Sequence, residues 1–177
     1  LHHHRRHLGD LMIPQLRLTL VSTIDVEALK AATQRGGENA MPAVAEALRE
    51  HVDSCFEREG DPWGNAWEPL APATITERAR KNKSGKILQR DGVLRRSVFA
   101  EPTAVEPGVT RAFVSAGGPA AAYASAQQFG TEDIPARPFM PLRGDAVDLP
   151  PDLKTEIAET IKDAIRAELQ AAREADR

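Results

Sequence analysis

Apolar residues recur at every fourth position near the end of the chain, and most positions between them are charged. The stripe consists of Leu153, Ile157, Ile161, Ile165 and Leu169. Four residues turn an α-helix by about 400°, so this stripe winds slowly around the helix instead of forming a straight heptad seam. We therefore predict a long amphipathic C-terminal helix, residues 150–177, that packs on the core domain or on a neighbouring subunit.

The first part of the chain contains one extended pattern. Leu16, Leu18 and Leu20 stand at every second position, which is roughly the pattern of a half-buried strand. The histidine-rich start does not follow any such pattern, and we expect residues 1–12 to form a flexible segment. The core domain is then expected to span residues 13–149.

Two separate helices are expected between the first strand and the middle of the chain. Asp25 can cap a short helix over residues 26–34, and Gly36–Gly37 is expected to end it. A second helix follows Pro42, and its apolar positions recur at helical spacing until Gly60.

The middle of the chain alternates between short patterns and turn-forming residues. In order, the patterns predict an ordered loop (61–72), a helix (72–81), a helical turn (92–97), a hairpin (97–105 with 109–116), a helix (120–129) and an extended proline-rich segment (134–142). The fold class that these elements predict is α+β, with a small, mainly antiparallel sheet flanked by helices and the long C-terminal helix.

Composition excludes several classes of protein and site. Hydrophobic residues make up 41% and charged residues 28% of the 177 residues, as in ordinary globular proteins. The apolar stretches are shorter than the roughly 18 residues that span a bilayer, so we expect no membrane association. Cys55 is the only cysteine, and the glycines form no phosphate-binding loop. We therefore expect no enzyme, and no catalytic, cofactor-binding or metal site.

The charge is unevenly distributed. The chain has a net charge of −3, but residues 77–96 hold eight basic and two acidic side chains. One interpretation is a DNA-binding accessory protein that uses the basic segment 78–96, with phosphate contacts from Arg78, Lys81, Lys83 and Lys86. The other is a solvated surface, which is the more common role of such a run.

Three groups of residues, in order along the chain, resemble one known family. The first is a Pro-Trp-Gly turn with a second tryptophan, a Pro-Leu step and a threonine, here Pro62-Trp63-Gly64-Asn65-Ala66-Trp67-Glu68-Pro69-Leu70 and Thr74. The second is Leu88, Gly92, Leu94, Ser97 and Val98. The third and most specific is Tyr123-Ala124, Gln128-Phe129-Gly130 and Ile134-Pro135-Ala136-Arg137-Pro138-Phe139.

These groups, which cover roughly residues 44–142, resemble the phage virion morphogenesis family, also called the tail completion family of tailed bacteriophages. Gln127 stands where that family often has histidine. The resemblance implies a structural protein of the virion, assembled in the host cytoplasm, that completes the tail and joins it to the head. Its implied partners are copies of itself in a ring, the tail tube and the head-tail connector.

The same groups supply the candidate interaction residues: Trp63, Trp67, Gln128, Phe129, Pro135, Arg137 and Phe139. Aromatic residues are enriched at binding hot spots, but Trp63 and Trp67 can equally pin their loop onto the core of the subunit. Arg137 can hold a carboxylate with two parallel hydrogen bonds, within the subunit or across a ring interface. These alternatives are open at the level of sequence.

Overall fold

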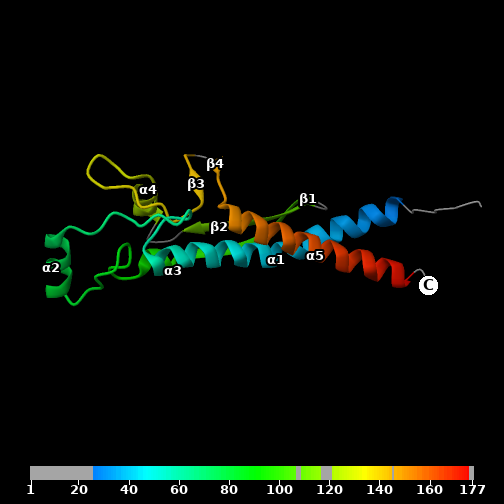
Figure 1. Cartoon of the computed structure of the whole chain (residues 1–177), viewed down its shortest axis with the longest axis horizontal. Helices are drawn as coiled ribbons and strands as arrows, with labels where there is room; N and C mark the ends of the chain where they lie inside the picture. The colour runs from blue at the N-terminus through cyan, green and yellow to red at the C-terminus, as the bar shows by residue number, and fades with distance from the viewer. Residues whose placement is uncertain (1–25, 107–108, 117–120, 145, 176–177) are drawn as a thin grey trace, which may run out of the picture.

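The computed structural model describes residues 26–106, 109–116, 121–144 and 146–175. The expected strand around Leu16–Leu20 and the expected flexible segment 1–12 lie outside the described residues. The elements, in chain order, are α1 (Val26–Arg58), α2 (Pro72–Arg80), α3 (Val93–Arg96), β1 (Val98–Glu106), β2 (Val109–Ala116), α4 (Ala121–Phe129), β3 (Leu142–Arg143), β4 (Ala146–Val147) and α5 (Pro151–Ala175). The long helices α1 and α5 lie side by side along the molecule, and α2 and α4 lie toward one end (Figure 1).

One long helix replaces the two short helices expected at the start. α1 runs for 33 residues through Gly36, Gly37 and Pro42, so the predicted break was wrong. Gly36 faces α5 so closely that a Cβ atom there would lie 2.6 Å from the Cα of Ile165. Pro42 removes one helical N–H, but apolar contacts with α5 on both sides of it maintain the helix.

In the helix pair α1–α5, the stripe that was predicted at the C-terminus is buried at Leu153 and partly buried along the rest of its length. Ile157 and Ile161 pack against the cluster that Leu153 forms with Ala40, Val44 and Leu48 of α1. Glu168 of α5 accepts hydrogen bonds from Arg35 at 3.1 Å and from Asn39 at 2.9 Å. The predicted long amphipathic helix is confirmed, and within this chain it packs along α1.

A second cluster of buried residues lies at the end of α1. The ring of Phe56 lies 5.8 Å from Trp67 and 5.5 Å from Phe139, measured between centroids. Leu94 of α3 belongs to the same cluster and is 1% exposed. One aromatic cluster therefore joins α1, the 61–72 loop, α3 and the proline-rich segment.

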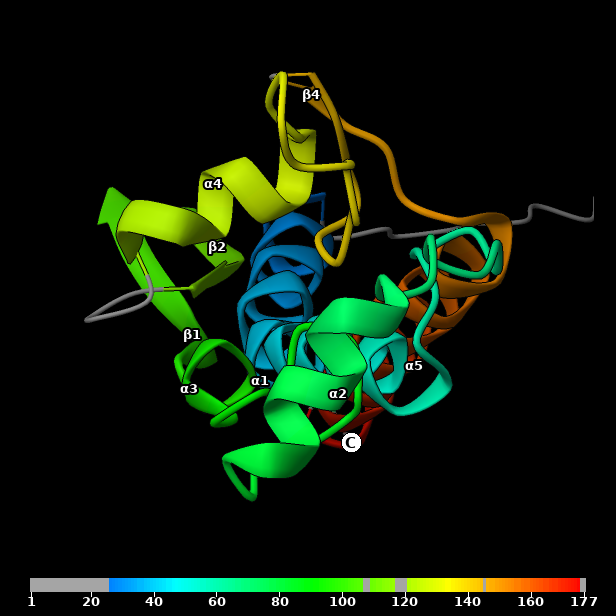
Figure 2. The same cartoon turned by 90° about the vertical axis from the view of Figure 1, so that its left-hand side faces the viewer.

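The hairpin β1–β2 is antiparallel and lies against α1, as Figure 2 shows from the end of the molecule. Val98, Val114 and Ala116 pack against the aromatic cluster. Phe99 and Phe113 lie on the other face, 46% and 37% exposed, with ring centroids 6.1 Å apart. With the short antiparallel pair β3–β4, which the sequence did not predict, these elements confirm the α+β class.

None of the helices in the described part of the chain combines the length and the apolar character needed to cross a membrane.

Candidate binding groove

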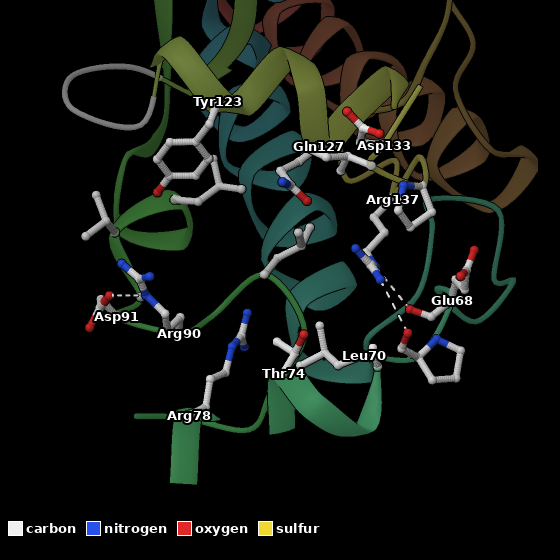
Figure 3. Close-up of a pocket in the computed structure, with 18 residues that line it drawn as sticks. Glu68, Leu70, Thr74, Arg78, Arg90, Asp91, Tyr123, Gln127, Asp133 and Arg137 are labelled. Carbon is white, nitrogen blue, oxygen red and sulfur yellow. Dashed lines mark hydrogen bonds and ion pairs between the residues drawn. The ribbon is translucent and has the colours of Figure 1, made fainter. Parts of the chain in front are cut away.

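An open groove of about 760 Å³ lies at the end of the molecule that carries α2 and α4. Its walls come from four segments that are far apart in sequence: residues 68–78, 88–94, 123–127 and 133–137. All three groups of residues that carry the family resemblance contribute to it (Figure 3). The groove is therefore the candidate functional site.

Arg137 connects two of these segments. Its Nε donates to the carbonyl oxygen of Glu68 at 3.0 Å, and its Nη2 donates to that of Pro69 at 3.4 Å. The indole N–H of Trp67 donates to the carbonyl oxygen of Pro138 at 2.8 Å. The partners of Arg137 within the subunit are thus two carbonyl groups rather than the carboxylate considered from sequence.

Gln128 holds the proline-rich segment against α4. Its side-chain carbonyl accepts the backbone N–H groups of Phe139 and Met140, both at 2.9 Å, and its amide donates to the carbonyl of Met140 at 3.0 Å. Gly130 ends α4 at φ +75°, and a Cβ atom there would lie 2.9 Å from the nitrogen of Ala136. The side chain of Gln128 therefore pairs with the backbone of the proline-rich segment, as an adjacent strand does in a β-sheet.

The opposite wall is fixed by bonds to α1 and within the basic segment. Gln89, which is buried, donates to the carbonyl oxygen of Phe56 at 2.7 Å. Arg95 forms a two-bond pair with Asp53, at 2.6 Å for each bond, and lowers the pKa of that carboxyl group. Arg78 donates from Nη1 to the carbonyl of Lys86 at 2.9 Å. These contacts hold the 81–94 segment in place beside α2.

Three arginine side chains from different segments line the groove: Arg78 and Arg137, which point toward its middle, and Arg90, which pairs with Asp91 at its side (Figure 3). Burial lowers the pKa of Arg78, and the positive charges of Arg90 and Arg137 lower it further. Asp91 pairs with Arg90 at 2.7 Å and with Lys83 at the same distance. Arg90 is therefore partly neutralised by Asp91, whereas Arg78 and Arg137 bond only to neutral carbonyl groups and keep their positive charge.

The seven candidate interaction residues divide into two sets. Trp67, Gln128, Arg137 and Phe139 are buried within the subunit. Phe129 is 49% exposed, and Trp63 and Pro135 are half-buried, so these three reach the surface. The ring of Trp63 lies under the guanidinium of Arg143, with 4.5 Å between its centroid and Cζ.

All four candidate DNA-contacting residues lie in the described part of the chain. Lys81 pairs with Glu77 at 2.5 Å, Lys83 pairs with Asp91, and Arg78 points into the groove. Lys86 is exposed. Two of the four cations therefore have a carboxylate partner.

Sequence reasoning did not select Arg90 and Tyr123 as site residues, although both line the groove. Arg90 belongs to the basic segment and Tyr123 to the third motif group, so both lay in segments that the sequence had singled out, but the sequence did not show that their side chains line a common groove.

No cluster of three or more potential metal ligands occurs among the described residues. Burial raises the pKa of the Cys55 thiol to about 11, and His51 directs Nε2 toward the carbonyl of Pro62 at 3.1 Å.

Comparison with known proteins agrees with the motif groups. No solved structure matches the chain. A curated relative, the Mu-like prophage FluMu G protein 1 of Haemophilus influenzae, is 32% identical over 126 residues, which cover 71% of this chain and 82% of that protein. Residues 22–170 match the phage virion morphogenesis family. A match over most of the length, together with such a relative, means that the chain belongs to the phage virion morphogenesis family.

Proposed function

We propose that this protein completes the phage tail and joins it to the head, as a ring of identical subunits at the head-proximal end of the tail. Membership of the family assigns the chain a structural role in virion assembly. The observation that supports the finer role is the convergence of all three motif groups on one groove at one end of the subunit. A surface built from those segments is suited to contact with a neighbouring virion protein. The protein would assemble in the host cytoplasm and stay in the virion.

The exposed face of the β1–β2 hairpin supports the proposal of a ring. Phe99 and Phe113 present an exposed aromatic pair on the face of β1–β2 that α1 does not cover. Aromatic residues are enriched in the cores of protein interfaces, and a ring needs two different surfaces on each subunit. The aromatic pair offers one surface for contact between copies, and the groove end remains available for the tube or the connector.

The test of tail completion is genetic. Deleting the gene should leave filled heads beside tails that are unattached or abnormally ended, as seen by electron microscopy of the lysate. Supplying the protein from a plasmid should restore infectious particles. A deletion strain that yields normal numbers of infectious particles would refute the proposal.

The ring is tested separately by substitution at the hairpin. Phe99→Asp should reduce incorporation of the protein into virions, because it places a charge in the contact between copies. Val147→Asp is the matched control, since Val147 is 70% exposed and lies on the short strand β4. Equal incorporation of the two variants would exclude the aromatic pair as a subunit contact.

A further inference from the structure

The groove has hydrogen-bond donors that the fold does not use. Arg78 uses Nη1 for the carbonyls of Ser84 and Lys86, and Arg137 uses Nε and Nη2 for those of Glu68 and Pro69. A guanidinium has five N–H groups, so each arginine keeps donors for a ligand. Because carbonyl partners are neutral, these bonds leave the positive charge of both arginines in place.

The carboxylates that line the groove limit what kind of anion can enter. Figure 3 shows the guanidinium groups of Arg78 and Arg137 pointing toward the middle of the groove. The side chain of Glu68 points away from it, and Asp133 lies at the edge. A single negative group placed between the arginines meets mostly positive charge. A chain of phosphates crossing the whole groove also meets Asp91 and Asp133, which disfavours DNA.

The rest of the lining is apolar. Leu70, Leu88, Val93, Ile134 and Pro135 contribute to the walls. The volume of about 760 Å³ lies within the range of pockets that hold a small ligand or a short peptide segment. The groove therefore combines an anion site with apolar contact area.

We propose that the groove binds a short extended segment of a neighbouring virion protein, which places a carboxylate between Arg78 and Arg137 and an apolar side chain against the walls. Arginine binds a carboxylate through parallel charge-assisted hydrogen bonds, which are stronger than neutral ones. Binding of this segment rests on the proposed function in one respect, which is that the protein supplying the segment belongs to the same virion.

The test places a photocrosslinker in the groove of the protein in whole particles. Tyr123 lines the groove and is 41% exposed, so p-benzoylphenylalanine is introduced there by amber suppression in a complemented deletion phage. The matched control carries it at Ile75, which is 48% exposed on α2 and outside the groove lining. We expect irradiated virions to give a crosslinked peptide with Asp or Glu at the Tyr123 site, mapped by mass spectrometry.

Two substitutions test the carboxylate. Changing the mapped Asp or Glu of the partner to Asn or Gln should lower the yield of the crosslink about 10-fold or more, because a hydrogen bond to a charged group contributes about 1.5–3 kcal/mol. Arg78→Gln should lower it as well, whereas Arg80→Gln, on α2 and outside the groove lining, should not.

Several results would overturn the proposal. These are a crosslink to DNA, a yield at Tyr123 no higher than at Ile75, or a yield that does not depend on the partner's carboxylate. None of them affects tail completion, which fails only if the deletion strain makes normal particles. The two proposals are therefore separable.

Discussion

Replacement of Gly36 by alanine tests whether close approach of α1 and α5 holds the long helix pair together. An alanine Cβ at this position would lie 2.6 Å from Cα, 2.9 Å from N and 2.9 Å from Cγ1 of Ile165. Carbon atoms in contact are ordinarily separated by about 3.5–4.0 Å, so α5 has to move by roughly 1 Å. Two of the three atoms are backbone, and a change of side-chain rotamer cannot relieve the clash.

The adjacent glycine provides a matched control. A Cβ atom at Gly37 meets nothing within 4 Å. Alanine inside a helix is more favourable than glycine by about 0.5–1 kcal/mol, and this gain applies to both positions. Overpacking costs about 1–3 kcal/mol and applies to Gly36 alone. Gly37→Ala should therefore stabilise the protein, and Gly36→Ala should be about 1–3 kcal/mol less stable than Gly37→Ala.

The measurement is urea unfolding followed by circular dichroism at 222 nm. Both variants should keep the slope of the wild-type protein and differ in midpoint, because the change lies in the packing of the native state. If Gly36→Ala is as stable as Gly37→Ala, the two helices do not approach each other at Gly36 as described, and the explanation for the continuous α1 is refuted.

Three further predictions use the same unfolding assay. Pro42→Ala should stabilise the protein by about 1–3 kcal/mol, because it restores a helical N–H on an exposed position of α1, and destabilisation would contradict the continuous helix. Trp67→Phe should cost about 2–3 kcal/mol, since it leaves the carbonyl of Pro138 unpaired in the core, whereas Trp63→Phe should cost about 1 kcal/mol or less because it keeps a ring under Arg143. Burial raises the pKa of Cys55 from 9.0 to about 11, so its contribution is fully present below pH 9 and is lost as the pH rises through 11. The wild-type protein should lose about 2–3 kcal/mol more than Cys55→Ala over this interval, and equal losses would contradict the shift.

Local pattern was sufficient to predict most helices and the hairpin. α2, α4 and α5 begin or end close to prolines and glycines that mark their limits, and α5 follows its four-residue stripe. α1 was wrongly divided because the role of Gly36 depends on Ile165, which belongs to a helix far along the chain. The pair β3–β4 has two residues in each strand, which is too short to produce a periodic signal.

The sequence supplied single candidate interaction residues, but it did not predict how their side chains lie together. The three motif groups were identified from a family resemblance, and only the structure shows that they meet at one groove. Gln128 is buried because its side-chain carbonyl accepts the backbone N–H groups of Phe139 and Met140, and no pattern in the adjacent sequence predicts those hydrogen bonds. Arg90 was assigned to a general basic run, and only the structure shows that it lines the groove.

The contact between the first and last helices also constrains when the chain can fold. Arg35 and Glu168, which pair across α1 and α5, are separated by 133 residues, so the apolar face of α1 is covered only in part, by Ala112 and Val114 of the hairpin, until α5 has been synthesised. At about 5–20 residues per second, synthesis of the 133 residues from Arg35 to Glu168 takes roughly 7–27 s. During that interval Ala40, Val44 and Leu48 lack their contacts with α5 and are accessible to chaperones and to other nascent chains. A subunit of this design becomes competent for assembly only after α5 has been synthesised and has packed on α1.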